Sequence, residues 1–182
     1  MRIIAGEFRR RHLKSVPGLD VRPTPDRLRE SLFNVLAPRL PGAVFVDAYA
    51  GTGAVGIEAL SRGASQVVFL EKDRRAAAVI RENLSTLGAS ARAEVRIGSA
   101  APSLAALHAG IVFLDPPYPL ASEYDAAFAA LARGDCPLVV VQHASRHELP
   151  KVIGALRHIR LIRQGDNSLS FYERIGERTH VV

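Results

Sequence analysis

The sequence predicts a doubly wound α/β fold, built on a mostly parallel sheet of seven strands. Short apolar runs alternate along the chain with segments of helical periodicity, the pattern of a sheet with helices on both faces. A tight glycine turn joins the first apolar run of the core to a helix, as at the start of many parallel sheets. The 182 residues are 48% hydrophobic, which is enough for one domain with a substantial core.

Residues 1–20 are predicted to form a basic hairpin that extends the main domain, residues 21–182. Residues 1–40 contain nine Arg or Lys and four Asp or Glu, a net charge of +5 out of +6 for the chain. Five basic residues surround a short apolar pattern and are placed to contact the phosphates of a polyanion: Arg2, Arg9, Arg10, Arg11 and Lys14. A solvated tail without structure is the alternative.

A helix is predicted over residues 22–40. Thr24 is suited to the N-cap and Pro25 to the first helical position. Thr24 and Arg27 fall on or near polar faces, so spacing alone makes them surface residues. The apolar side chains recur at helical spacing and should dock on the sheet: Leu28, Leu32, Val35 and Leu36.

The glycine turn follows an apolar strand that begins at residue 44. Gly51 and Gly53 permit backbone torsions, and a close approach of a ligand, that a side chain would prevent. A second apolar run, residues 66–70, leads to Glu71, which lies 20 residues beyond Gly51. An acid at that position can bind the hydroxyls of a ribose. This Rossmann-like context indicates a cofactor that contains a nucleoside.

Asp47, at the start of the loop, narrows the identity of that cofactor. A carboxylate beside the glycines would repel the pyrophosphate of a dinucleotide. It suits the ammonium and sulfonium charges of S-adenosylmethionine, so the sequence favours a methyl donor over NAD. A nicotinamide enzyme remains the alternative, because acids also flank some dinucleotide loops.

The rest of the chain continues the alternation of strands and helices. Asp73 is predicted to cap a helix that runs to about residue 87. Ser99, after the third strand, fits two interpretations equally, a contact to an adenine ring or a helix cap. Further helices are predicted over residues 123–132 and 149–156. The later strands are predicted over residues 93–97, 110–115, 137–142, 158–163 and 169–174.

Asp115, Pro116, Pro117 and Tyr118 follow the apolar run at residues 110–114 and form a pocket for a flat ring that bears an amine. Asp115 and the Pro116 carbonyl can accept hydrogens from an exocyclic amine, and Tyr118 can stack on a base swung out of its helix. The same residues could simply end a buried strand. Because ligands collect at the carboxyl ends of parallel strands, this motif and the glycine turn should face each other across one crevice.

Other residue types exclude several kinds of chemistry. Cys136 is the single cysteine, which rules out an internal disulfide. As a nucleophile it would suit a cytosine-5 enzyme, but its place at the start of the fifth strand favours a buried structural thiol. His143 and His147 lack the partner acid of a zinc helix, so no metal is expected. Without a signal peptide or an apolar run of about 20 residues, the chain is expected in the cytoplasm, away from membranes.

Four stretches of the chain are characteristic when taken together with the Asp-Pro-Pro-Tyr motif. They are the opening Met1-Arg2-Ile3-Ile4-Ala5-Gly6, the segment from Arg22-Pro23-Thr24 through Arg27 to Asn34, the loop Asp47 to Gly53 and the stretch Glu58 to Ala64. With them the chain resembles the RsmD family of bacterial 16S ribosomal RNA guanine-N2 methyltransferases over nearly its whole length. The first two stretches are the discriminating ones, because the glycine loop and the Asp-Pro-Pro-Tyr motif alone would fit any amino-group methyltransferase. Tyr49 and Thr52 replace the more usual Phe and Ser of the family.

This resemblance implies methyl transfer from S-adenosylmethionine to the N2 amine of a guanine in 16S rRNA, with Asp115, Pro116 and Tyr118 at the reacting amine. It also makes Thr24 and Arg27 cofactor contacts. The implied partner is 16S rRNA in the small ribosomal subunit or its assembly intermediate, and the protein is expected to be a monomer. The expected cofactor contacts are Thr24, Arg27, Asp47, Tyr49, Gly51, Gly53, Glu71 and Ser99, the last in place of the acid that many methyltransferases have at the adenine.

Several other functions share part of this pattern. A DNA methyltransferase, or an amino-group methyltransferase acting on another RNA or on a protein, would have both motifs. The basic N-terminus argues against a protein acceptor, and the lack of a separate target-recognition domain argues against sequence-specific DNA modification. A non-catalytic RNA-binding protein would need the basic face, but it need not keep Gly51, Gly53, Glu71 and Asp115 together.

Overall fold

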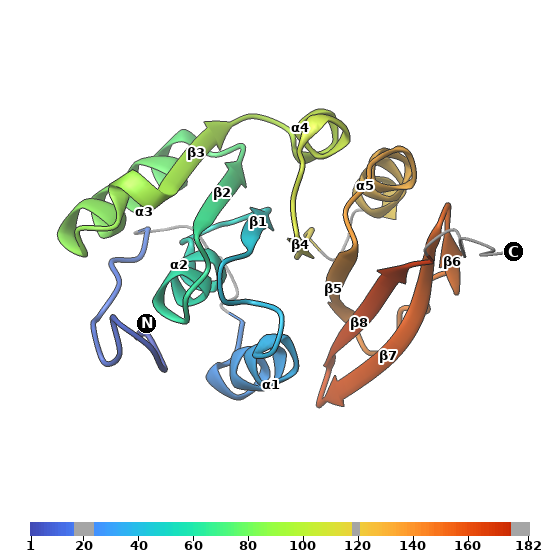
Figure 1. Ribbon diagram of the computed structural model, residues 1–182, viewed down its shortest axis with the longest axis horizontal. Helices are drawn as coiled ribbons and strands as arrows, with labels where there is room; N and C mark the ends of the chain where they lie inside the picture. Colours follow the sequence, from blue (N-terminus) through green and yellow to red (C-terminus); the bar gives the residue numbers. More distant parts are fainter. Residues whose placement is uncertain (17–23, 118–120, 176–182) are drawn as a thin grey trace, which may run out of the picture.

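The computed structural model describes residues 1–16, 24–117 and 121–175. At its centre lies one eight-stranded sheet with the order β3-β2-β1-β4-β5-β8-β7-β6 (Figure 1). The first five strands in the chain pair in parallel, and the last three pair antiparallel at one side of the sheet. The strands are β1 Val44–Ala48, β2 Gln66–Glu71, β3 Ala93–Ile97, β4 Ile111–Leu114, β5 Leu138–Ala144, β6 Val152–Ile153, β7 Leu156–Gln164 and β8 Asn167–Arg174.

The predicted α/β class is confirmed, and strand order reverses between β1 and β4 as expected, but the count of seven strands is wrong. The extra strand, β6, lies in residues 149–156, where the sequence predicts a helix. Pro150 and Gly154, whose φ is +57°, are both poor residues for a helix interior. The chain therefore forms the short β6 and turns directly into β7, with Ile153 paired to Leu156.

Helices cover both faces of the sheet (Figure 1). One face carries α1 Asp26–Leu36, α2 Ala54–Ser61 and α3 Arg74–Thr86. The other carries α4 Ala100–Ala106 and α5 Ala121–Arg133, while a short 3-10 helix, Ser90–Arg92, precedes β3. Within the described residues, none of these helices has both the length and the apolar character needed to cross a membrane.

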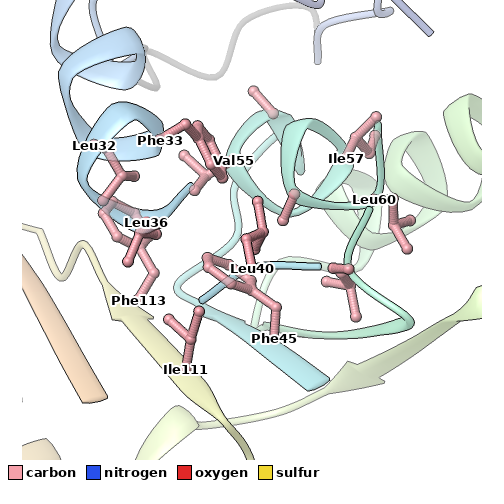
Figure 2. Close-up of a cluster of buried hydrophobic side chains, with 14 of the residues drawn as sticks. Leu32, Phe33, Leu36, Leu40, Phe45, Val55, Ile57, Leu60, Ile111 and Phe113 are labelled. Atoms are coloured by element: carbon pink, nitrogen blue, oxygen red, sulfur yellow. The ribbon is translucent and has the colours of Figure 1, made fainter. Parts of the chain in front are cut away.

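Side chains of the central strands alternate between two apolar layers, as the pleat of a sheet requires. Phe45 of β1 and Phe113 of β4 join the layer that contains Leu32 of α1 (Figure 2). Val46 of β1 and Leu114 of β4 join the opposite layer with α4 and α5. This alternation determines which helices each polar residue at a strand end will face.

The start of α1 differs from the prediction. Pro25 occupies the N-cap with ψ of 140°, and the helix runs from Asp26 to Leu36 instead of ending near residue 40. Thr24 precedes a proline, a position that disfavours helical backbone. Thr24 is also buried, contrary to the surface position that spacing predicts, and its hydroxyl donates to the side chain of Gln142.

The N-terminal residues form a docked hairpin, so the alternative of a solvated tail is wrong. Arg2 and His12 make an antiparallel bridge at its base. Gly6 has φ of +83° and packs so closely on α2 that an added Cβ would lie 1.8 Å from the Ser61 carbonyl oxygen. The carboxylate of Glu58 accepts from the backbone N–H groups of Ile4 and Ala5. Three apolar side chains of the hairpin are buried in the core: Ile3, Phe8 and Leu13.

Candidate active site

The glycine loop between β1 and α2 is held by Asp47. Asp47 is on the same face as Phe45, only 2% exposed, and its Oδ2 accepts from the Gly56 N–H at 2.8 Å. Gly51 and Gly53 have φ of 55° and 76°, which L side chains rarely adopt. The loop therefore has the backbone that the sequence predicts, and Asp47 fixes it to the first turn of α2.

Acidic groups come together at the carboxyl ends of β1, β2 and β4. Burial raises the pKa of Asp47 well above its usual range, and the neighbouring carboxylates of Asp115 and Glu71 raise it further, against the Gly56 hydrogen bond. The two predicted motifs are thus close enough to influence each other electrostatically. A cationic ligand at this edge would relieve that repulsion, which fits the sulfonium of S-adenosylmethionine.

Glu71 ends β2 and bridges two backbone segments. Its Oε2 accepts from the Gly51 N–H at 2.7 Å, and its Oε1 accepts from the Asp73 N–H at 2.8 Å. Each carboxylate oxygen has a second lone pair with which to accept from a ribose hydroxyl. Asp73 caps α3 as predicted, by accepting from the backbone of Arg75 and Ala76.

Ser99 lies at the N-cap of α4, but its hydroxyl makes no capping hydrogen bond. Its neighbour Gly98 donates a backbone hydrogen bond to the Glu71 carbonyl at 3.0 Å, so the exposed Ser99 follows directly beside the end of β2. Ser99 therefore has the N-cap position without a capping hydrogen bond, and the adenine contact stays a prediction.

Tyr49 is a non-glycine residue with left-handed backbone, at φ of 66°. Its hydroxyl donates to Glu123 Oε2 at 2.9 Å, which ties the glycine loop to the first turn of α5. Burial, followed by the bond to Glu123, raises the pKa of Tyr49. A strained backbone of this kind costs roughly 1–3 kcal/mol and is concentrated at functional sites. The sequence did not predict Glu123 as its partner.

On the acceptor side, Asp115 follows β4 and is held by a residue that the sequence analysis missed. Gln142 Nε2, near the end of β5, donates to Asp115 Oδ2 at 3.0 Å. Thr24 donates to Gln142 Oε1 at 3.1 Å, so Thr24 reaches Asp115 through one amide. Pro116 is buried beside them, whereas Tyr118 lies outside the described residues. A polar residue after the apolar start of β5 was the only sequence signal for Gln142.

The remaining predicted contacts lie on exposed surfaces. Arg27 is exposed on α1, and its role stays a prediction. Of the five predicted RNA contacts, Arg2 lies 3.7 Å from Asp26, Lys14 pairs with Glu82, and Arg11 Nη2 donates to the Thr86 carbonyl. The other two, Arg9 and Arg10, are exposed and form no ion pair with any residue in the described part of the chain.

Cys136 and the histidines have structural surroundings. Cys136 is buried just before β5, and burial raises the pKa of its thiol to about 11, so it is a poor nucleophile. His143 is buried as well, with Nε2 2.9 Å from the Ser170 hydroxyl. Among the described residues, no group of three or more His, Cys, Asp or Glu side chains could hold a metal ion.

Comparison with known sequences shows which family this chain belongs to. A family model described as "Conserved hypothetical protein 95" matches residues 1–173. The chain belongs to this family. A candidate rRNA methyltransferase of Bacillus subtilis is 34% identical over 193 residues, covering 97% of this chain and 100% of that protein. "Ribosomal RNA small subunit methyltransferase D" of Haemophilus influenzae is 43% identical over 123 residues, covering 65% of this chain and 64% of that enzyme.

Solved structures of similar proteins share the fold along its whole length. A candidate methyltransferase of Escherichia coli has a TM-score of 0.82 and 35% identity, covering 97% of this chain and 99% of that one. A candidate methylase of Haemophilus influenzae has a TM-score of 0.81 and 32% identity over the same shares. The expectations of the RsmD family and of a methyltransferase are confirmed.

Proposed function

We propose that this protein transfers the methyl group of S-adenosylmethionine to the exocyclic N2 amine of a guanine in 16S rRNA. The observation that carries the proposal is the proximity of the acceptor motif to the glycine loop: Asp115 directly follows β4, the neighbour of β1, and raises the pKa of Asp47. The similarity to enzymes named as ribosomal RNA small subunit methyltransferases supports the choice of substrate.

On the donor side, the loop residues bind S-adenosylmethionine and the carboxylates orient it. S-adenosylmethionine, when bound, supplies an electrophilic methyl group on a positively charged sulfonium. Gly51 and Gly53 give the loop its left-handed backbone, Glu71 accepts from the ribose hydroxyls, and Asp47 balances the positive charge. We assign the remaining donor contacts to Thr24, Arg27, Tyr49 and Ser99.

On the acceptor side, Asp115 and the Pro116 carbonyl accept the two hydrogens of the guanine amine. The lone pair of that nitrogen is delocalised into the ring, so two acceptors rehybridise it and aim the lone pair at the methyl carbon. The new N–C bond forms as the C–S bond breaks, with no covalent bond to the enzyme, and Asp115 is the group suited to take the released proton. Tyr118 stacks on the base, a contact worth roughly 1–3 kcal/mol.

The N-terminal hairpin provides the contact to RNA phosphates. Arg9 and Arg10 are the basic residues of its turn that are exposed and without an ion pair among the described residues. Arg2, Arg11 and Lys14 extend the same basic surface. We expect the substrate to be 16S rRNA in the small subunit or an assembly intermediate, and the protein to act as a monomer in the cytoplasm.

The test is transfer of labelled methyl groups to three acceptors: unmodified 16S rRNA, small subunits that lack the modification, and duplex DNA. The product nucleoside is then identified by mass spectrometry. N2-methylguanosine in RNA or in subunits is the expected result. Label in DNA alone would overturn the rRNA substrate while leaving the donor assignment intact. Label in another nucleoside would overturn the assignment of the acceptor atom.

A further inference from the structure

Gln142 is a buried amide at the carboxyl edge of the sheet. The register pairs Val141 of β5 with Leu114 of β4, so Gln142 lies beside Asp115, the next residue on the neighbouring strand. The Gln142 side chain is only 4% exposed, in a place where an amide without partners would destabilise the fold. Alternation along β5 turns it to the same face as Val140, which is the face covered by α1.

The amide of Gln142 has one polar partner at each end. Nε2 donates to Asp115 Oδ2 at 3.0 Å, and Oε1 accepts from the Thr24 hydroxyl at 3.1 Å. An ionised carboxylate only accepts hydrogen bonds, so the nitrogen must face Asp115 and the oxygen must face Thr24. The Tyr124 hydroxyl donates to the backbone carbonyl of Gln142 at 3.3 Å, which steadies β5 from the opposite face.

We propose that Gln142 is a positioning residue for methyl transfer, which holds the Asp115 carboxylate in the orientation that the acceptor amine requires. The inference rests on the proposed function, because it assigns the role of Asp115 as amine acceptor. The side chain of an aspartate can take a wide range of torsion angles about its Cβ–Cγ bond, so a donated hydrogen bond decides which way the carboxylate oxygens point. Thr24 holds the amide in turn, which makes the segment before α1 a support of the acceptor half.

Gln142 also acts on the charge of Asp115. A hydrogen bond donated to a carboxylate favours its ionised form, which is the form that accepts amine hydrogens. Asp47 on β1 has the opposite effect, because the repulsion between the Asp47 and Asp115 carboxylates favours protonation. Loss of the Gln142 amide should therefore shift protonation of Asp115 to higher pH.

The first test is Gln142→Leu, which keeps the size of the side chain and removes the amide. We expect kcat for RNA methylation to fall roughly 10- to 100-fold, since small misplacements of a reacting group have effects of that size. Affinity for S-adenosylhomocysteine, measured by calorimetry, should stay within about twofold of wild type, because Asp115 contacts the acceptor. The low-pH limb of the pH–rate profile should move to higher pH.

The matched control is Ser170→Ala. Ser170 is buried on β8, pairs with Val141 and contacts His143, so its loss removes a buried hydrogen bond next to Gln142 without touching Asp115. Its Tm should fall while kcat per folded molecule stays unchanged. If kcat fell equally in Gln142→Leu and Ser170→Ala, the effect at Gln142 would be explained by loss of stability alone, and the inference would be overturned.

Thr24 gives a second, milder pair of variants. Thr24→Val is nearly isosteric and removes only the hydroxyl that holds Gln142, so kcat should fall several-fold, less than in Gln142→Leu. Thr24→Ser restores the hydroxyl and should recover activity. An unchanged kcat in Thr24→Val at saturating donor would leave Thr24 with its donor contact alone and contradict the proposed chain of contacts.

A readout without any acceptor separates this inference from the proposed function. The titration of the Asp115 carboxyl carbon can be followed by 13C NMR in wild type and in Gln142→Leu. A shift of that titration to higher pH in the variant supports the inference even if no RNA is methylated. An unchanged titration, or equal kcat in wild type and Gln142→Leu, would overturn it even if the wild type makes N2-methylguanosine.

Discussion

The two carboxylates of the donor half are held by local contacts, whereas the carboxylate of the acceptor half is held by distant ones. Asp47 and Glu71 accept from the N–H groups of Gly56 and Gly51, which lie 9 and 20 residues away in the sequence. Asp115 is held by a side chain 27 residues away, and that side chain by Thr24 at a separation of 118 residues. Asp47 and Glu71 therefore take their positions wherever β1, β2 and their turns form, while Asp115 also needs α1 and β5 in place. Tyr49 is the exception in the donor half, because its partner Glu123 is 74 residues away.

This difference predicts how each half responds to mutation. Substitutions other than proline leave a backbone N–H in place, so the positions of Asp47 and Glu71 should tolerate most changes outside the loop's own motif. The orientation of Asp115 depends on two further side chains, each of which can be replaced. Variants of the acceptor half should therefore change kcat, and variants of the donor half should change donor affinity.

The largest effect is expected for Asp115→Asn. The amide can still accept from Gln142 through its oxygen, but it carries no charge and cannot take the proton of the amine. We expect kcat to fall about 10³-fold, within the range for loss of a group that transfers protons. S-adenosylhomocysteine affinity, measured by calorimetry, should be nearly unchanged. Asp125→Asn, on the exposed side of α5, is the control with the same chemical change, and its kcat should equal that of wild type.

A clear loss of donor affinity in Asp115→Asn would contradict the division of the site. Asp115 would then belong with Asp47 and Glu71, and the acceptor amine would need another hydrogen-bond acceptor. Single-turnover kinetics at saturating donor distinguish the two outcomes, because they measure the chemical step separately from donor binding.

The same division explains what the sequence could predict. The backbone of the glycine loop, the position of Glu71 at the end of β2 and the Asp73 cap were predicted correctly, because residue type and spacing within one strand-turn-helix unit define them. Gln142 was missed because its role depends on the register between β4 and β5 and on the docking of α1. Thr24 was assigned to a helix cap for a related reason, since its partner is 118 residues away.

One further error has a local physical cause, and one set of contacts was not predicted at all. The apolar pattern of residues 149–156 suits a helix, but Pro150 and the left-handed Gly154 favour the turn into β7 that forms β6. In the stretch that matches the family after the glycine loop, Glu58 and Ser61 turned out to bind the backbone of the N-terminal hairpin. Sequence similarity marked these positions without indicating what they contact.

The second prediction concerns the N-terminal hairpin and its attachment to Glu58 of α2. Glu58 is fully buried and accepts from the N–H groups of Ile4 and Ala5 and from Arg62 Nε. Glu58→Ala should lower the free energy of unfolding by about 3 kcal/mol, because it leaves a mostly buried cation and two amides without their acceptor. Denaturant unfolding measures this change, and trypsin should then cleave faster within the hairpin.

Glu82→Ala is the matched control. Glu82 pairs with Lys14 of the same hairpin, but on the exposed surface, where such pairs contribute at most about 1 kcal/mol. Similar small losses of stability in both variants would mean that apolar burial alone holds the hairpin. Donor affinity should be unchanged in both, because neither side chain contacts the glycine loop.

A smaller effect is expected for Glu71→Gln. The amide keeps the shape of the side chain, but one end now carries donors and cannot accept from both Gly51 and Asp73, or from both ribose hydroxyls. Loss of one hydrogen bond to a charged group costs about 1.5–3 kcal/mol, so S-adenosylhomocysteine should bind about 10- to 100-fold more weakly. At saturating donor, kcat should change little. A large fall of kcat with affinity retained would mean that the donor half also positions the acceptor.

The smallest effect is expected for Asp47→Asn, because the amide oxygen can still accept from Gly56. Burial and the carboxylates of Asp115 and Glu71 raise the pKa of Asp47 in the folded protein above its unfolded value. The folded state therefore binds the proton more tightly, and this contribution to stability is complete below the ordinary pKa of about 4 and lost as pH rises through the folded pKa. The measurement is the Tm of both proteins as a function of pH. As pH rises from about 4 through the folded pKa of Asp47, the Tm of wild type should fall relative to that of Asp47→Asn.

Bound S-adenosylmethionine should reduce this difference in Tm, because its sulfonium favours the ionised carboxylate. A Tm difference that is independent of pH would show that Asp47 keeps its charge at no cost, and that the repulsion between the two halves is relieved before any ligand binds.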